Sequence, residues 1–270
     1  MKRFAPLIAV AFVSLITPAF GEMNIDVVVD GLNNPWEMVF APNGDIYFSE
    51  RDGRVWKIEN FGEAKVIQTF PKSGSYEGGT LGLALHPNFE ENKKIYIYQT
   101  NLELEFFQNK VFSFTVDGDE LIDVQTVIDD IPGAPWHDGG RIAFGPDEKL
   151  YITTGDAVNP GWSQDLTSLA GKILRINSDG TIPDDNPFDS SAIFSYGHRN
   201  PQGIAWNEDG MLVSSEHGPS GEMGYGHDEI NVIVKGKNYG WPKVVGDSSD
   251  ESYVNPIIHS GEQTWAPSGM

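Results

Sequence analysis

One histidine of the chain stands in a setting that suits proton transfer. The segment WHDGGR, at residues 136–141, places His137 just before paired glycines. Glycines let a backbone come close to a ligand, and the near-neutral pKa of histidine suits a general base. A histidine taken alone is more often structural than catalytic. The segment YGHRNPQG, at residues 196–203, supplies Arg199 and Asn200 in a second polar loop. Because both segments precede similar strands, we expect them on one face of the fold, which favours a functional role.

Oxygen-rich segments follow further along the chain. Gly218 and Pro219 lie in SEHGP, Glu229 lies in DEIN, and Tyr239 lies in GKNYGWP. Carboxylates and backbone carbonyls in a constrained loop suit a hard cation such as calcium, although an Asp-Glu pair alone is usually a solvated turn. The sequence has no zinc-ligand spacing, no phosphate-binding glycine loop and no Gly-x-Ser-x-Gly elbow. Their absence argues against a zinc site, a nicotinamide cofactor and serine esterase chemistry.

A recurring phrase indicates which elements position these loops. An apolar strand end, a turn rich in Pro, Asn, Asp or Gly, and a second strand recur in segments that begin at Val39, Ala84, Ala143 and Ala205. Each copy is typical of a β-hairpin, and a spacing of roughly 45 to 60 residues matches one four-stranded propeller blade. A β-sandwich also has short strands, but it would not repeat one phrase four times. Helical periodicity is nearly absent. We predict an all-β fold, an incomplete β-propeller of about four to five blades.

The composition agrees with a soluble, turn-rich domain. The chain of 270 residues is 39% hydrophobic and contains 30 Gly, 17 Pro and no Cys. Its 39 acidic and 18 basic side chains give a net charge of -21, which repels a polyphosphate backbone, so we predict no nucleic-acid partner. Without disulfides, stability must come from core packing, with bound metal as a further source.

The N-terminus has the pattern of a secretory signal peptide. A basic start and an apolar run to residue 20 predict a signal peptide over residues 1–21, cleaved near Glu22, ahead of a domain over 22–270. An uncleaved anchor is the alternative, but Pro6 and Pro18 interrupt the run, which is short for a full span. We therefore predict a secreted or periplasmic protein with no stable membrane span. Because the sequence stops at Met270 on the approach to another strand, we also expect a C-terminal truncation.

Six segments together resemble the glucose/sorbosone dehydrogenase family, which includes the soluble quinoprotein glucose dehydrogenases and the aldose sugar dehydrogenases. They are GGTLGLALHP at residues 78–87, His137 with GGR at 139–141, GHRNPQG at 197–203, EHGP at 216–219, DEIN at 228–231 and NYGWP at 238–242. The similarity runs from about Leu32 to the end of the chain. Any one motif is weak, but six in the family's order are specific.

The resemblance implies a six-bladed propeller with pyrroloquinoline quinone (PQQ) on its top face. His137 matches the family's catalytic base, which takes a proton from the anomeric hydroxyl of an aldose as hydride leaves for the quinone, giving a lactone. Glu77, Arg199 and Asn200 match residues that contact the quinone, and the Arg199 guanidinium could also pair with a developing oxyanion. The sequence identifies neither the sugar nor the electron acceptor.

By the same resemblance, calcium would polarise the quinone. The backbone carbonyls of Gly218 and Pro219 match its ligands, and Glu229 and Tyr239 match a calcium site of the aldose dehydrogenase branch. A bound Ca²⁺ would act as a Lewis acid on the quinone carbonyl.

Departures from the family pattern leave other functions open. Glu77 replaces a Gln found in many members, and Thr80 replaces a Leu. Trp136 replaces an acidic residue of the glucose dehydrogenase branch, which favours the aldose branch. We expect the basic residues of the family's last blades to lie beyond Met270. The alternatives are a non-catalytic secreted propeller that binds sugars or a protein partner, and a calcium-dependent hydrolase such as a lactonase. His137 and the Arg199–Asn200 pair favour the dehydrogenase, because a scaffold alone has no need of them.

Overall fold

A computed structural model describes residues 26–72, 76–103, 106–219 and 226–270. The predicted signal peptide, residues 1–21, lies outside these residues. The described strands form four antiparallel sheets of four strands each. The first sheet contains β1 (Pro35–Phe40), β2 (Ile46–Glu50), β3 (Arg54–Ile58) and β4 (Ala64–Thr69). The second contains β5 (Thr80–Leu85), β6 (Lys94–Glu103), β7 (Phe106–Asp117) and β8 (Glu120–Pro132).

The remaining two sheets repeat the same order. The third contains β9 (Ile142–Phe144), β10 (Leu150–Thr154), β11 (Lys172–Ile176) and β12 (Ile193–Tyr196). The fourth contains β13 (Pro201–Trp206), β14 (Leu212–Glu216), β15 (Glu229–Val232) and β16 (Ile258–His259). Two short helices, α1 (Phe89–Asn92) and η1 (Pro160–Gln164), lie between strands. Neither these nor any other helix of the described residues is long and apolar enough to cross a membrane.

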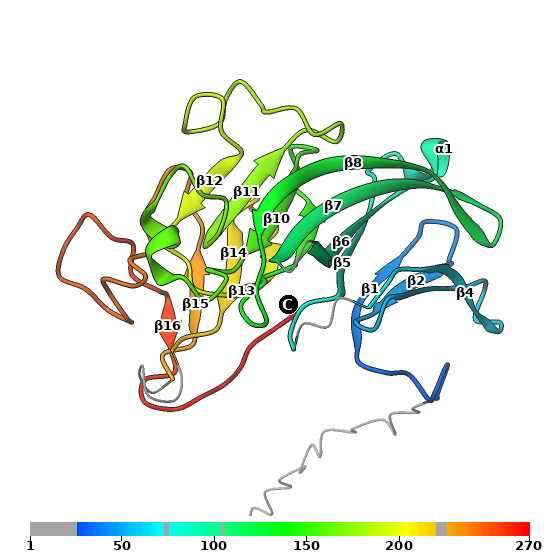
Figure 1. Cartoon of the computed structure of the whole chain (residues 1–270), viewed down its shortest axis with the longest axis horizontal. Coiled ribbons are helices and arrows are strands. Elements are labelled where there is room, and N and C mark those ends of the chain that lie inside the picture. The colour runs from blue at the N-terminus through cyan, green and yellow to red at the C-terminus, as the bar shows by residue number, and fades with distance from the viewer. Residues whose placement is uncertain (1–25, 73–75, 104–105, 220–225) are drawn as a thin grey trace, which may run out of the picture.

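The four sheets follow one another around an arc, as blades of a propeller (Figure 1). The first strands contact one another in sequence, β1 with β5, β5 with β9 and β9 with β13, so they form the inner side of the arc. Each repeated phrase covers the connection between the first and second strands of a blade. The prediction of an all-β propeller is confirmed, with four blades described.

Apolar side chains pack between neighbouring blades. Tyr47 and Val55 of the first blade meet Leu83, Ile95 and Ile97 of the second in one buried cluster. Further clusters join the second blade to the third and the third to the fourth. Full burial of an aliphatic side chain contributes roughly 1.5 to 3 kcal/mol. The blades therefore stabilise one another and fix the ends of their strands in space.

Arg141 links three blades near the inner side of the arc. Its guanidinium pairs with Glu37 of β1 and donates from Nε to the carbonyl of Gln202 of β13 at 2.9 Å. It also lies 3.9 Å from the ring centroid of Trp36. Because Arg141 is buried and occupied by these contacts, its role in the HDGGR segment is to hold the blades together.

Candidate active site

Three connections between consecutive blades converge on one cavity. Glu77 lies between β4 and β5, His137 between β8 and β9, and Arg199 with Asn200 between β12 and β13. These side chains line a cavity of about 170 Å³. Its walls also include residues from the loop after β14 and from the C-terminal segment: His217, Gly218, Pro219, Asp228, Thr264 and Ala266. The structure thus brings the predicted base and the predicted quinone contacts together.

His137 adopts a backbone conformation that few residues other than glycine occupy. Its φ is 63°, and histidine is one of the residues that tolerate this left-handed region. Its backbone N–H donates to Glu77 Oε2 at 2.9 Å. A side chain on Gly155 would place Cβ 1.9 Å from the carbonyl oxygen of His137, so only glycine permits this approach. The surrounding contacts hold the strained loop in one conformation, as is common at functional sites.

Asp156 orients the ring of His137. Its Oδ1 lies 2.8 Å from His137 Nδ1, and its Oδ2 accepts a hydrogen bond from Trp241 Nε1 at 2.8 Å. Because a carboxylate only accepts, Nδ1 carries the proton and Nε2 is left with its lone pair. Asp156 is fully buried. The sequence prediction missed Asp156. The signal that could have found it is the Gly155–Asp156 pair, which directly follows β10 at the end of the blade that faces the cavity.

Glu77 and Asn200 form hydrogen bonds that link the three loops between blades. Asn200 Oδ1 accepts from the backbone N–H of Gly139 at 3.0 Å, and its Nδ2 donates to Glu77 Oε2 at 3.4 Å. The carboxylate of Glu77 therefore receives protein donors from both Asn200 and His137. Oε2 of Glu77 thus faces protein N–H groups.

Arg199 and His217 both line the cavity. Arg199 Nη1 donates to the carbonyl of His217 at 3.3 Å, and the guanidinium lies 5.5 Å from the ring centroid of Trp241. Burial lowers the pKa of Arg199, and no carboxylate of the described residues forms an ion pair with it at 4.0 Å or less. Nε2 of His217 is buried without a hydrogen-bond partner among the described residues. Burial also lowers the pKa of His217, which keeps the ring neutral.

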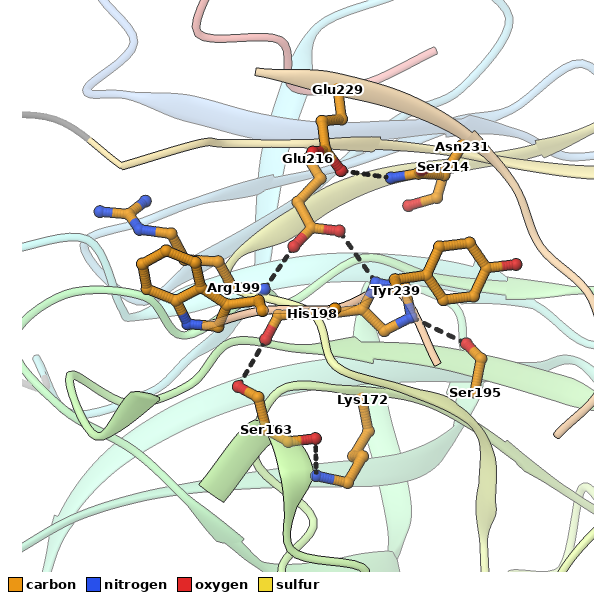
Figure 2. A network of polar contacts seen from close by, with 12 residues as sticks. Ser163, Lys172, Ser195, His198, Arg199, Ser214, Glu216, Glu229, Asn231 and Tyr239 are labelled. Atoms are coloured by element: carbon orange, nitrogen blue, oxygen red, sulfur yellow. Dashed lines mark hydrogen bonds and ion pairs between the residues drawn. The ribbon is translucent and has the colours of Figure 1, made fainter. Parts of the chain in front are cut away.

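A second, smaller cavity lies beside the first and contains two carboxylates. Glu216 and Glu229 line it with Tyr239, and Gly218 and Pro219 border both cavities. Figure 2 shows the two glutamates one above the other. Burial and the nearby carboxylate of Glu216 raise the pKa of Glu229 to about 8. Two carboxylates that line one small cavity, and whose charges act on each other, favour either a shared proton or a bound cation.

The hydroxyl of Tyr239 is already hydrogen-bonded within the protein, so it is not available to a cation. Its hydroxyl donates to the carbonyl of Val232 at 2.6 Å and accepts from the N–H of Val234 at 2.8 Å. The backbone carbonyl is therefore the oxygen that could face an ion. Among the described residues, no group of three or more His, Asp or Glu side chains could hold a metal, so a cation here would depend on Glu216, Glu229 and backbone carbonyls.

His198 packs next to the smaller cavity, and neither of its ring nitrogens is available to a ligand. Its Nδ1 bonds to Glu216 Oε2 at 2.9 Å and its Nε2 to Ser195 Oγ at 2.9 Å (Figure 2). The ring stacks on Tyr239 with 4.6 Å between centroids. With both nitrogens bonded and the side chain fully buried, His198 is structural. The other Glu216 oxygen accepts from the backbone N–H of Arg199, so this network also places the guanidinium.

The sequence matches the family described as Glucose / Sorbosone dehydrogenase over residues 32–270. The chain belongs to this family. Quinoprotein glucose dehydrogenase B of Acinetobacter calcoaceticus is 34% identical and covers 84% of this chain and 54% of its own length. Aldose sugar dehydrogenase YliI of Escherichia coli is also 34% identical, over 88% of this chain and 66% of its own length. The chain thus spans about half to two thirds of these two curated relatives.

A solved structure that is similar to this chain has the same fold. The PQQ-bound form of aldose sugar dehydrogenase from Streptomyces coelicolor matches with a TM-score of 0.83 and 37% sequence identity. The match covers 91% of this chain and 73% of that chain. This likeness confirms the resemblance read from the six motifs.

Proposed function

We propose that this protein oxidises the anomeric CH–OH of neutral aldoses to the lactone, with PQQ as the hydride acceptor and His137 as the base. The observation that carries the proposal is the His137–Asp156 pair at a cavity shared with Arg199. The names of the relatives support the same class of reaction. The predicted location, outside the cytoplasm, belongs to this proposal as well.

His137 would take the hydroxyl proton at Nε2. With Nδ1–H bonded to Asp156, Nε2 is the nitrogen with a lone pair, and the carboxylate stabilises the imidazolium that forms. Removing this proton strengthens the tendency of the anomeric carbon to lose hydride.

The residues around the cavity suit an anionic quinone. Arg199 has no ion pair with a described carboxylate, so its guanidinium can pair with a cofactor carboxylate or a developing oxyanion. Asn200 and Glu77 border the same space. When bound, the quinone supplies the electron-pair acceptor that no side chain offers. The fixed loop of His137 would keep the base beside the anomeric hydroxyl.

Calcium would be held where the two cavities meet. The backbone carbonyls of Gly218 and Pro219 would face the quinone side, and Glu229 with the Tyr239 carbonyl would face the smaller cavity. We add Glu216 to the candidate calcium ligands of the smaller cavity, because its carboxylate lines that cavity together with Glu229. Oxygen donors of this kind match the ligand preference of Ca²⁺.

Stopped-flow reduction of bound quinone by an aldose tests the proposal. In protein loaded with PQQ and calcium, His137→Ala should slow quinone reduction by about 10² to 10⁴ while PQQ binding is kept. Asp156→Asn should also slow it strongly, because the amide can donate to Nδ1 and leave the proton on Nε2. Arg199→Ala should weaken PQQ binding as well as the rate.

The control is His86→Ala. His86 lies at the far end of β5 from Glu77, so its loss should leave the rate unchanged. A His137→Ala variant that reduces its quinone as fast as the parent would exclude His137 as the base, and His217 would be tested next. A parent that binds PQQ but is reduced by no aldose would favour the non-catalytic sugar- or protein-binding propeller.

A further inference from the structure

A tight turn after β10 holds two consecutive residues in the left-handed region of the backbone. Ala157 has a φ of 50° and Val158 a φ of 60°, and the N–H of Asn159 donates to the carbonyl of Asp156 at 2.9 Å. These are features of a type I′ turn, whose central positions are ordinarily Asn, Asp or Gly. A β-branched residue at positive φ is a rare exception. The surroundings of Val158 therefore impose its conformation at an energetic cost.

Side-chain packing does not account for the conformation of Val158. Its side chain is 51% exposed and belongs to none of the hydrophobic clusters of the described residues. Ala157, in contrast, is buried in one cluster with Ala134 and Ala170, which anchors the first half of the turn. The contribution of Val158 to the structure is therefore made by its backbone.

The backbone of the turn contacts the candidate base and its carboxylate partner. The N–H of Val158 donates to Asp156 Oδ1 at 2.9 Å, and the same oxygen lies 2.8 Å from His137 Nδ1. The N–H of Ala157 donates to the carbonyl of His137 at 3.2 Å. A right-handed or extended backbone would point these N–H groups elsewhere. The turn thus fixes both the main chain of His137 and the oxygen that its ring contacts.

Two donors from different blades hold the carboxylate of Asp156. Trp241 Nε1 donates to Oδ2 at 2.8 Å, while the N–H of Val158 donates to Oδ1. The carboxylate cannot rotate without breaking one of these bonds, so Oδ1 stays directed at His137 Nδ1. Without the N–H of Val158, only Oδ2 would be held and Oδ1 could turn away from the ring.

We propose that Val158 is a positioning residue, whose backbone N–H holds Asp156 toward His137 and thereby keeps the ring proton on Nδ1. This inference rests on the proposed function, because it concerns the base of that reaction. It requires the N–H and the left-handed backbone at this position, not the valine side chain. Glycine meets both requirements. Proline meets neither, because it has no N–H and fixes φ near about −65°.

The tautomer of His137 tests the proposal without any turnover. NMR spectra that correlate the ring protons and nitrogens of histidine report which nitrogen carries the proton, and comparison with His137→Ala assigns the signals. The parent and Val158→Gly should carry the proton on Nδ1. Val158→Pro should show a mixture with the Nε2–H tautomer. A proton confined to Nδ1 in folded Val158→Pro would overturn the proposal.

Glu148→Pro is the matched control. Glu148 is an exposed residue with a φ of 60° in the turn between β9 and β10, at the other end of the same blade. Its N–H donates to the carbonyl of Gly145 at 2.9 Å. Proline there breaks a comparable turn but should leave the tautomer of His137 unchanged. The same change of tautomer in both proline variants would trace the effect to general destabilisation and would also overturn the proposal.

Kinetics of protein loaded with PQQ and calcium give a second readout. Val158→Pro should lower kcat for an aldose by about 5- to 50-fold and change KM by less than about two-fold, because the base is misaligned rather than lost. In an Asp156→Asn background, Val158→Pro should lower kcat by less than about two-fold more, since the turn acts through that carboxylate. Full multiplication of the two losses would contradict this route of action.

The two readouts separate this proposal from the proposed function. A parent that oxidises no aldose would overturn the proposed function, while the tautomer comparison would still decide the role of Val158. If Val158→Pro does not fold, one glycine inserted between Ala157 and Val158 breaks the turn in its place, since exposed loops tolerate insertions. The expected tautomer mixture and loss of kcat are the same for that variant.

Discussion

The role that we propose for His137 depends on its contacts more than on its residue type. Glu77 fixes its backbone, Asp156 fixes its tautomer, and Gly155 lets the two loops approach closely. His198 is also a histidine and directly precedes Arg199 and Asn200. Its bonds to Glu216 and Ser195, however, leave no nitrogen for a ligand. His198 is therefore a structural support, whereas His137 keeps Nε2 available and is the base that we propose.

The partly buried carboxylate of Glu229 should make stability depend on pH. Burial and Glu216 raise its pKa from the ordinary 4.5 to about 8. The folded state then binds more protons than the unfolded state between these values. This contribution to stability is complete below about pH 4.5 and is lost as the pH rises through about 8. In calcium-free buffer, the free energy of unfolding of the parent should therefore fall over this range more steeply than that of Glu229→Gln.

Urea denaturation at several pH values measures the difference. Glu120→Gln serves as the control, because Glu120 is an exposed carboxylate at the start of β8. Its slope should follow that of the parent. Saturating calcium should raise the parent's stability most at the alkaline end, where the carboxylate is ionised, and by about 2.7 kcal/mol when its concentration is 100 times the Kd. Identical slopes for the parent and Glu229→Gln would contradict the assignment.

At the scale of elements, a buried lysine anchors the turn beneath the site. Lys172 begins β11, and its Nζ donates to the carbonyls of Trp162 at 2.7 Å, Ala170 at 2.6 Å and Ser163 at 3.2 Å. Ser163 in turn donates from Oγ to the carbonyl of His198 at 2.6 Å (Figure 2). The ammonium thus connects the short helix η1 to the loop that carries Arg199 and Asn200.

We predict that Lys172→Met lowers the free energy of unfolding by about 2 to 4 kcal/mol. Methionine has a similar length but leaves three carbonyls without their donor, and an unmet buried acceptor costs roughly 1 to 3 kcal/mol. Removal of a buried charge offsets part of this loss. The exposed Lys243→Met should change stability by no more than about 0.5 kcal/mol. If the two variants unfold at the same urea concentration, Lys172 is not an anchor.

The blades could be predicted from the sequence because their signals are local. Each repeated phrase contains its own turn residues and strand alternation, so the hairpins at β1–β2, β5–β6, β9–β10 and β13–β14 follow from neighbouring residues. The matching positions of the polar segments also predicted that His137, Arg199 and Asn200 would share one face, and they line one cavity.

The contacts between blades could not be predicted in this way. Asp156 bonds to His137 although the two are 19 residues apart in the sequence. Glu216 and His198 are 18 residues apart. Such pairs depend on how the strand ends of neighbouring blades align, which the local pattern does not encode. Arg141 was grouped with the functional loop for the same reason, and only its partners in the first and fourth blades reveal its structural task.

At the scale of the whole molecule, two properties of the surface oppose each other. The first sheet carries exposed apolar side chains, among them Met38 and Phe40, which alternate on one face of β1, and Phe61. With Val28 and Leu32 they line an apolar hollow of about 440 Å³. Apolar patches of this kind promote association, while a net charge of -21 keeps copies of the chain apart.

This balance predicts that the 270-residue chain associates when salt is added. The Debye length falls from about 14 Å at 0.05 M salt to about 4 Å at 0.5 M, so repulsion weakens while the apolar contact persists. Sedimentation velocity should show a shift to larger species at the higher salt. Phe40→Glu should reduce it, because a charge enters the hollow. Val124→Glu adds the same charge at a side chain that is 56% exposed on β8, outside the hollow, and should reduce association much less. A parent that stays monomeric at both salt concentrations would mean that the apolar face of the first blade does not drive association, and equal effects of the two glutamates would trace the change to net charge alone.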